Sequence, residues 1–206
     1  RALRNVVVSS NLKGFRNDSF NITAASEIMG ILCLSKDLDD LKNRIANILF
    51  GYDVDGKPLY AKDLKVEEAM TILLKDAIKP NLVQTLEGNP AFVHGGPFAN
   101  IAHGCNTIIA TDMALRMSDY VITEAGFGAD LGAEKFLDIK CRVGNFTPSA
   151  ILVNATIRSL KYDFVNKDKE NMVKGLNNLK FHIENMLKYT GNVAVCLNHF
   201  ENDSED

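Results

Sequence analysis

The stretch from His94 to Cys105, HGGPFANIAHGC, combines residue types that can bind an anion. The run AFVH predicts a strand, the Gly-Gly-Pro sequence at 95–97 allows a sharp backbone turn, and a helix is expected to begin within 98–101. The N–H groups at such a helix start point back into the turn and can hold a phosphate or carboxylate without a basic side chain. A Gly-Gly-Pro turn can also serve tight packing alone, and the residues leave these two interpretations equally open.

A second stretch, VITEAGFGADLGAE at 121–134, also carries polar residues at the end of a predicted strand. Glu124 closes the strand, two glycines flank Phe127, and Asp130 stands at the start of a predicted helix. The glycines permit close approach of a flat ligand, on which the aromatic ring could stack. Glu124 and Asp130 could hold magnesium or a monovalent cation, or accept a proton. The functional interpretation is favoured for Glu124, whereas helix capping is favoured for Asp130.

The four histidines differ in what their surroundings predict. His94 and His103 lie near Cys105, but the three have none of the standard spacings of a zinc site. His103 could contact a phosphate or donate a proton, and a purely structural role is an equally open interpretation. His182 lies within a predicted amphipathic helix and is expected to be structural, whereas His199 follows a strand end, where α/β proteins bind ligands.

The stretch GYDVDGKP, Gly51 to Pro58, fits the first seven places of a phosphate-binding loop, G-x-x-x-x-G-K. A working loop needs a buried strand before it, a helix after it, and a Ser or Thr where this sequence has proline. Here an amphipathic helix precedes the stretch, LYAKDL follows it, and Asp55-Gly56 is a strong hairpin-turn signal. The context therefore predicts a surface hairpin with Lys57 in solvent.

The elements that must position these stretches divide the chain into a mainly helical part and a part in which strands and helices alternate. In residues 1–80, apolar spacing predicts helices within 21–35, 37–50 and 63–80, with a hairpin at 51–60. In residues 81–206 the predicted strands are NLVQTLE, AFVHGG, DYVITEAG, SAILVNATI and NVAVCLNHF, and the predicted helices are ANIAHGCNTIIATDMALRMS, GADLGAEKFLDIKC and NMVKGLNNLKFHIENMLKY.

This alternation predicts a single α/β domain over 1–206, with a mostly parallel sheet and helices on both faces. In such sheets the ligand lies in the crevice beyond the carboxyl ends of the strands. The loops after Val93, Thr123, Ala155 and Leu197 are therefore expected to face one common site.

Composition and charge narrow the class of protein. The chain has 206 residues, 46% of them hydrophobic and 24% charged, which suffices for one sizeable core. A net charge of -3 gives no electrostatic footprint for nucleic acid or an anionic membrane, and no apolar run reaches the ~18 residues of a membrane helix. The four cysteines include no C-x-x-C pair, which predicts reduced thiols in a cytoplasmic protein. Because the chain opens on Arg1 directly before a strand-like run, it is expected to be a segment of a longer protein.

Two long runs, TLEGNPAFVHGGPFANIAHG and TEAGFGADLGAEKF, are specific enough to indicate a family. With the rest of Leu73 to Arg142 they closely resemble formate–tetrahydrofolate ligase, and the resemblance extends over nearly the whole chain. It implies ATP-dependent ligation of formate to tetrahydrofolate, which gives 10-formyltetrahydrofolate, ADP and phosphate through formyl phosphate. It further implies Mg²⁺ on the nucleotide, activation by a monovalent cation such as K⁺ or NH₄⁺, and assembly as a homo-oligomer, a tetramer in the family.

The resemblance also implies a P-loop NTPase-like three-layer architecture whose phosphate loop, ending in G-K-T or G-K-S, lies outside this segment. The segment would supply the facing wall of the site. A non-catalytic paralogue or accessory domain that keeps the fold and the oligomer contacts is the alternative. One departure from the family lies after Lys161, where a glycine pair usually follows the V-A-T-I-R-A-L-K signature and this chain has none.

Residue roles are implied for three groups of positions. Catalytic roles fall on Glu124, His103 and Asp130. Binding of formyl phosphate or folate falls on Gly95, Gly96, Pro97, Phe98, Ala99, Asn100, Ile101, Ala102, Gly104, Gly126, Phe127 and Gly128. Contacts to the nucleotide or folate fall on Thr156, Arg158, Asn198 and Phe200. No metal ligand is assigned to this segment.

Overall fold

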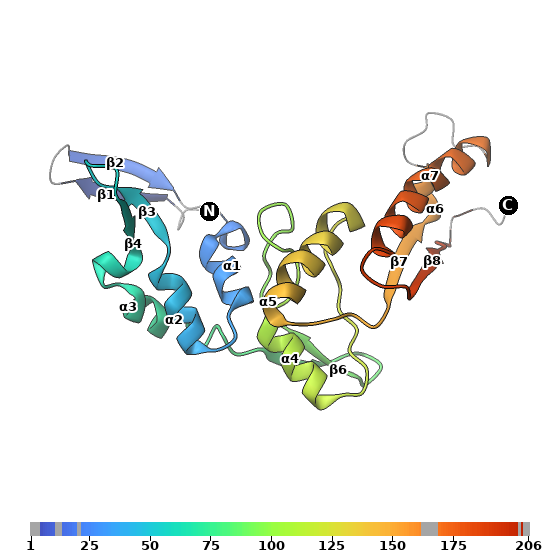
Figure 1. Cartoon of the computed structure of the whole chain (residues 1–206), viewed down its shortest axis with the longest axis horizontal. Helices are drawn as coiled ribbons and strands as arrows, with labels where there is room; N and C mark the ends of the chain where they lie inside the picture. Colours follow the sequence, from blue (N-terminus) through green and yellow to red (C-terminus); the bar gives the residue numbers. More distant parts are fainter. Residues whose placement is uncertain (1–4, 11–13, 20–21, 162–168, 202, 204–206) are drawn as a thin grey trace. The chain divides into compact units, whose positions relative to one another are not determined.

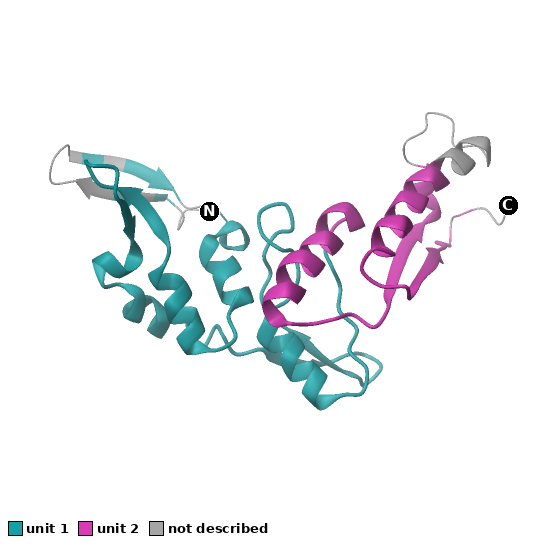
Figure 2. Ribbon diagram, in the orientation of Figure 1, with its two compact units in different colours: residues 1–126 teal, residues 127–206 magenta. Residues whose placement is uncertain are grey.

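The computed structural model describes residues 5–10, 14–19, 22–161, 169–201 and 203 (Figure 1). The chain divides into two compact units, Arg1–Gly126 and Phe127–Asp206, and each is described by itself (Figure 2). No helix within the described residues is long and apolar enough to cross a membrane.

The first unit begins with an antiparallel hairpin of β1 (Asn5–Ser10) and β2 (Gly14–Ser19). After a short 3₁₀ turn, η2 (Thr23–Ala25), three helices follow: α1 (Glu27–Leu34), α2 (Leu38–Ala46) and α3 (Glu67–Leu74). Their apolar stripes meet in one core, formed by Leu32, Cys33, Leu41, Ile45 and Ile78. The three helices predicted within residues 1–80 are thus confirmed, although each is shorter than its predicted range.

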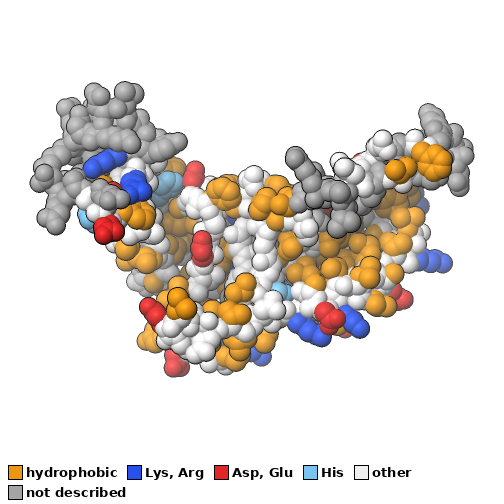
Figure 3. Space-filling model, turned by 180° about the vertical axis from the view of Figure 1, so that it is seen from behind, with side chains coloured by type: hydrophobic (Ala, Val, Ile, Leu, Met, Phe, Trp, Pro, Cys, Tyr) orange, Lys and Arg blue, Asp and Glu red, His pale blue; other side chains and the backbone are white. Residues whose placement is uncertain are grey.

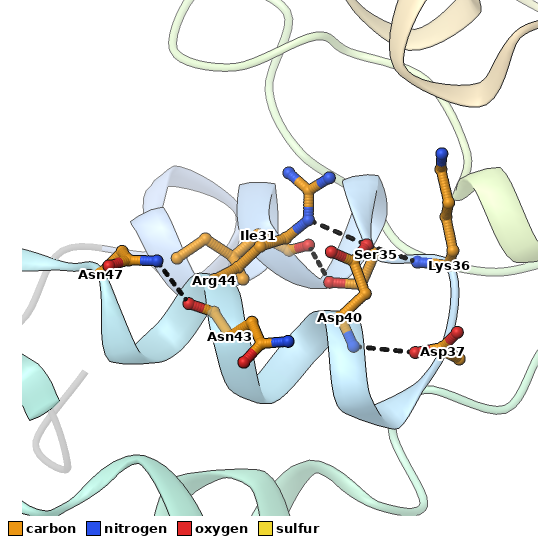
Figure 4. A network of polar contacts seen from close by, with 8 residues as sticks. All are labelled: Ile31, Ser35, Lys36, Asp37, Asp40, Asn43, Arg44 and Asn47. Carbon is orange, nitrogen blue, oxygen red and sulfur yellow. Dashed lines mark hydrogen bonds and ion pairs between the residues drawn. The ribbon is translucent and has the colours of Figure 1, made fainter.

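The turn between α1 and α2 is closed by side chains at both helix ends (Figure 4). Asp37 caps α2, because its Oδ1 accepts from Asp40 N–H at 2.8 Å. The Asp40 carboxylate accepts from Lys36 N–H and from Arg44 Nε, both at 3.0 Å. Ser35 donates its hydroxyl to Ile31 O at 2.7 Å and so ends α1. This network fixes the direction in which the chain leaves α1 and enters α2.

The stretch that imitates a phosphate loop is a hairpin, as predicted. β3 (Leu49–Tyr52) pairs antiparallel with β4 (Pro58–Tyr60), and η3 (Ala61–Leu64) follows. Asp53 N–H donates to Lys57 O at 2.9 Å, Asp53 Oδ1 accepts from Lys57 N–H at 2.8 Å, and Gly56 has φ of 80°. A helix start of the kind that holds phosphate does not follow this turn, and Lys57 is exposed.

The rest of the first unit differs from its predicted form in three places. β5 (Asn81–Gln84) and β6 (Pro90–Val93) form an antiparallel hairpin, because a five-residue connection is too short for a parallel crossover. The prediction that a helix begins within 98–101 is wrong. Those residues form a turn, and the helix, α4, spans Ile108–Met117. The stretch DYVITEAG, predicted as a strand, has no strand pairing in the structure.

The second unit contains one parallel pair of strands. It opens with π-helical turns η4 (Ala129–Ala133) and η5 (Phe136–Cys141) and a single turn of helix α5 (Arg142–Gly144). β7 (Ile151–Thr156), α6 (Ile157–Lys161), α7 (Lys169–Met186) and β8 (Val193–Asn198) follow. β7 and β8 pair in parallel from Ile151↔Val193 to Thr156↔Asn198, which confirms a βαβ unit in this part of the chain.

The core of the second unit lies under these strands, where Leu137, Cys141 and Met186 are buried. Two polar contacts tie α7 and the turn after it to the π-helical turns: Asn185 Nδ2 donates to Glu134 Oε1 at 2.5 Å, and Tyr189 Oη donates to Asp138 Oδ2 at 3.0 Å.

The α/β class is confirmed, but the mostly parallel sheet is not what the described residues form. Their strands make four two-stranded sheets, of which three are antiparallel and one is parallel. The alternation of strands and helices indicated the class correctly and could not indicate which strands pair.

Candidate functional site

A pocket of about 360 Å³ lies in the first unit, between the loop that follows β6 and the segment that ends at Gly126. It brings together five of the predicted binding residues and one of the predicted catalytic carboxylates, Glu124. The lining residues that the sequence singled out are Gly95, Gly96, Pro97, Gly104, Glu124 and Gly126. Phe92, Val93, His94, Cys105, Asn106, Ile122 and Thr123 complete the lining. Much of this wall is glycine backbone, so a ligand can approach main-chain atoms closely.

The two glycine-rich stretches are joined backbone to backbone. Gly126 N–H donates to Gly104 O at 3.1 Å. A Cβ at Gly126 would lie 2.8 Å from that carbonyl oxygen, so a larger residue could not keep this approach. Residues about twenty positions apart in the sequence therefore form one rim of the pocket.

The loop from Phe98 to Gly104 is a compact turn. Ala102 N–H donates to Phe98 O at 2.7 Å, and Phe98 N–H donates to Ala24 O at 3.1 Å, which ties the loop to η2. Gly104 has φ of 61°, and a Cβ there would lie 2.2 Å from the Cβ of Ala99. The left-handed backbone at Gly104 stops a helix from running through this loop, which explains why α4 begins only at Ile108.

The predicted helix start behind the Gly-Gly-Pro turn is therefore absent from the pocket wall. The N-terminus of α4 is capped by its own Thr107, whose Oγ1 accepts from Ala110 N–H at 3.1 Å. What the pocket offers to an anion is loop backbone and not the positive end of a helix.

The loop side chains named as binding residues fall into two kinds. Phe98 and Ile101 are 41% and 54% exposed and present apolar surface beside the pocket. Asn100 is also exposed, and Ala102 is half-buried. Ala99 is buried and packs against Gly104. None of these lines the pocket itself, whereas Pro97 does.

The candidate catalytic residues are placed differently from one another. Glu124 is exposed and lines the pocket. His103 is 1% exposed and is not part of the lining. Asp130 belongs to the second unit, in the first turn of η4. The N-cap of η4 is Gly128, so the expectation that Asp130 caps a helix is wrong; its carboxylate lies where it complements the helix dipole.

Phe127 carries a backbone conformation that is rare for its residue type. Its φ is 63° and its side chain is 71% exposed. A left-handed conformation costs an L-residue with a Cβ roughly 1 kcal/mol or more, and such outliers cluster at functional sites. Both facts distinguish Phe127 from an ordinary loop residue.

In the second unit, the residues predicted to contact nucleotide or folate gather at the carboxyl ends of β7 and β8. Thr156 pairs with Asn198 at the last position of the parallel register. The Arg158 guanidinium lies 4.5 Å from the centre of the Phe200 ring, a cation–π contact. The structure brings these four predicted residues to one end of the strand pair.

Asp203 belongs to the same cluster, and the sequence had not singled it out. Its Oδ2 accepts from Phe200 N–H at 2.8 Å, and its Oδ1 lies 3.5 Å from Arg158 Nε. The Phe200 N–H hydrogen bond, with the Arg158 charge as a smaller cause, lowers the pKa of the Asp203 carboxyl below its usual value. An aspartate three residues after an aromatic at a strand end was the available signal.

His94 and Thr107 are the other residues that sequence reasoning missed. His94 lines the pocket, is 6% exposed, and has both ring nitrogens in hydrogen bonds. Thr107 is completely buried beside it. The signal in the sequence was a histidine directly before a glycine pair, which had been considered only as a metal ligand.

Within the described parts of the chain, no three His, Cys, Asp or Glu side chains converge in a way that could hold a metal ion.

A comparison with models of protein families matches the one described as formate–tetrahydrofolate ligase over residues 1–206, the whole chain. The chain belongs to this family. At the family level the activity is ligation of formate to tetrahydrofolate, with ATP and tetrahydrofolate as substrates.

Proposed function

We propose that this chain forms one wall of the active site in which formate is ligated to tetrahydrofolate. In the first step a formate oxygen takes the terminal phosphoryl group of ATP and ADP leaves. In the second step the N10 amine of tetrahydrofolate attacks the formyl carbon, phosphate leaves, and the nitrogen loses a proton. The observation that carries the proposal is the pocket walled by Gly95, Gly96 and Gly104 with Glu124 on its lining, in a chain that matches the family throughout.

The wall suits the second step because negative charge develops on the formyl oxygen as the nitrogen attacks. Backbone N–H groups next to glycines can approach that oxygen without interference from a Cβ, and fixed donors of this kind stabilise an oxyanion. Gly95, Gly96 and Gly104 provide such backbone on the pocket lining. The loop 98–102 would form the outer edge of the formyl phosphate site, where the exposed Phe98 contributes apolar surface.

Glu124 is the best candidate on this chain for accepting the proton from the folate nitrogen, since it is exposed on the lining. His103 is the weaker candidate because it is buried away from the lining. On the second unit, Asp130 and Gly128 keep the roles that the family resemblance implies, and the exposed Phe127 ring could stack on the flat rings of folate.

The cluster at the ends of β7 and β8 would bind the nucleotide base or the folate ring. Thr156, Arg158, Asn198 and Phe200 would make these contacts, and the Phe200 ring is still 40% exposed beside Arg158. Strand ends of parallel pairs are where α/β proteins hold ligands, which supports this location.

The nucleotide phosphates would be bound outside this chain. The phosphate loop that holds ATP with Mg²⁺, and a P-loop NTPase-like three-layer fold around it, would come from further sequence of the same cytoplasmic protein, activated by a monovalent cation. Large apolar side chains exposed on both units, among them Leu73 at 82% and Leu152 at 65%, support packing against more protein (Figure 3). That protein would be the rest of a longer chain or another copy in a homo-tetramer.

The proposal is tested by assaying 10-formyltetrahydrofolate and ADP with the full-length protein, with and without formate. A ligase forms neither product when formate is withheld. ADP formation that continues without formate would favour a generic nucleotide hydrolase, and no product in either case would favour a non-catalytic paralogue or accessory domain.

Two substitutions in the same assay test the wall. Phe98→Ala removes apolar surface beside the pocket, and Gly104→Val places a Cβ 2.2 Å from that of Ala99 in a backbone with φ of 61°. Each is expected to lower formate-dependent turnover by about tenfold or more, because small displacements of positioning groups are costly in rate. Wild-type turnover in both variants would remove this loop from the mechanism.

A further inference from the structure

We propose that His94 is a positioning residue that holds the glycine wall of the pocket in place; this inference rests on the proposed function. His94 follows β6 directly and lines the pocket together with Gly95 and Gly96. Its Nδ1 lies 2.7 Å from Thr107 Oγ1, and its Nε2 lies 2.7 Å from Ala77 O. One imidazole therefore connects the segment after α3, the pocket loop and the start of α4.

The partners of His94 fix where its proton lies. A carbonyl oxygen only accepts, so Nε2 carries a hydrogen and donates it to Ala77 O. In that tautomer Nδ1 carries a lone pair and accepts the Thr107 hydroxyl hydrogen, while Thr107 Oγ1 accepts from Ala110 N–H. In this arrangement the imidazole completes a series of hydrogen bonds that runs in one direction from α4 to the segment after α3.

Gly95, in the glycine wall, packs closely against the side chains behind it. Gly95 has φ of 71°, and a Cβ there would lie 2.5 Å from Cys33 Sγ and 3.0 Å from Thr107 Cγ2. Cys33 and Thr107 are both completely buried. The residue after His94 thus rests directly on two fixed side chains, one of which is a hydrogen-bond partner of His94.

This arrangement gives His94 a role beyond filling the core. Movement of the imidazole would move Gly95 and Gly96, which line the pocket. Groups that stabilise a transition state must be held close to their productive positions by residues behind them. His94 and Thr107 are the side chains placed to do this for the glycine wall.

The test uses the full-length protein and three kinds of variant. His94→Gln keeps a donor toward Ala77 O and loses the contact with Thr107, Thr107→Val removes the hydroxyl, and Thr107→Ser keeps it. Ile45→Val is the matched control, because Ile45 is completely buried in the helical core and its loss of a methyl group lowers stability away from the pocket. Steady-state constants for formate and ATP are measured at a temperature where every variant is folded, and thermal midpoints are measured in parallel.

We expect His94→Gln and Thr107→Val each to lower kcat/KM for formate by about tenfold, with KM for ATP within about twofold of wild type. The double variant should lose about as much as either single variant, because both remove the same hydrogen bond. Thr107→Ser should recover most of the activity. The inference is overturned if the losses do not exceed that of Ile45→Val, or if the two single losses multiply in the double variant.

A second measurement separates this inference from the proposed function. Hydrogen exchange of the Gly95 and Gly96 amides is compared between His94→Gln and Ile45→Val. Faster exchange in His94→Gln supports the positioning role, and equal exchange overturns it. If the wild-type protein makes no formate-dependent product, the proposed function fails, and the amide exchange alone then decides the role of His94.

Discussion

Gly95 and Gly96 are neighbours in the pocket wall with different backbone requirements. Gly95 has φ of 71°, and its missing Cβ leaves room for Cys33 Sγ. Gly96 has no such φ, and a Cβ there would meet nothing within 4 Å. Substitutions at these two positions can therefore distinguish an effect on stability, expected at Gly95, from an effect on the pocket, expected at Gly96.

Gly95→Ala is expected to lower the free energy of unfolding by at least about 1 kcal/mol, since an L-residue is strained at this φ and the new methyl group meets Cys33. Gly96→Ala should leave stability within about 0.5 kcal/mol of wild type. It should still lower ligase activity, because its methyl group enters the pocket. Urea unfolding measures the first effect and the formate-dependent assay the second. Equal destabilisation by both substitutions would contradict the geometry.

Asp203 gives a pH dependence whose sign follows from its contacts. The Phe200 N–H hydrogen bond, and to a smaller extent Arg158, lower the pKa of its carboxyl in the folded chain below the ordinary value of 3.8. A lowered folded pKa means that the carboxylate stabilises the fold above about pH 4 and that this contribution is lost as pH falls through the folded pKa.

The Phe200 amide proton should report this titration in an NMR pH series, with a midpoint below 3.8. Asp203→Asn is the control, because an amide oxygen can still accept from Phe200 N–H but cannot be protonated in this range. The expected result is a titrating Phe200 shift in wild type and a flat one in the variant. A wild-type midpoint above 3.8 would show that the carboxylate is not stabilised in this way.

At the scale of elements, short-range sequence patterns predicted the helices and the hairpin that short-range interactions determine. Apolar spacing located α1, α2 and α3, and the Asp55-Gly56 signal located the hairpin of β3 and β4. The pairing of β5 with β6 was decided by a connection too short for a crossover. The short spacing between these two strands could have predicted an antiparallel hairpin. The prediction of a parallel sheet followed instead from the regular alternation of strands and helices further along the chain. The start of α4 was missed because the left-handed backbone at Gly104 depends on contact with Ala99.

The junction of α1 and α2 offers a matched pair for testing an element. Asp40→Ala removes the acceptor for Lys36 N–H and Arg44 Nε, whereas Asp39→Ala removes an exposed carboxylate from the same first helical turn. Both lose a similar interaction with the helix dipole, so the difference isolates the network in Figure 4. Asp40→Ala is expected to lower the free energy of unfolding by about 1 kcal/mol more than Asp39→Ala, measured in urea. Equal effects would mean that the network does not stabilise the junction.

At the scale of the whole molecule, the sequence indicated several residues of one pocket but did not indicate how the strands pair. The motifs around Gly95 and Glu124 were recognised separately, and both line one pocket. The hydrogen bond from Gly126 to Gly104 that joins them is a long-range contact that no local pattern encodes. The hydrogen bonds of His94 were not predicted for the same reason, since one of its partners, Ala77 O, lies on another segment. Sequence signals thus marked several residues of the pocket lining and missed the hydrogen bonds that hold it.

The 206-residue chain by itself is expected to bind ATP weakly. Its one approach to a phosphate loop is the hairpin of β3 and β4, whose turn is filled by its own Asp53 carboxylate and is followed by Pro58, which has no N–H to give. The chain should therefore bind ATP with Mg²⁺ far more weakly than the full-length protein and form no ADP in response to formate. Calorimetric titration and the ADP assay check this, with circular dichroism to establish that the chain is folded. Formate-dependent ADP from this chain would mean that its own residues hold the nucleotide, and the cluster of Arg158, Asn198 and Phe200 would be the first place to look.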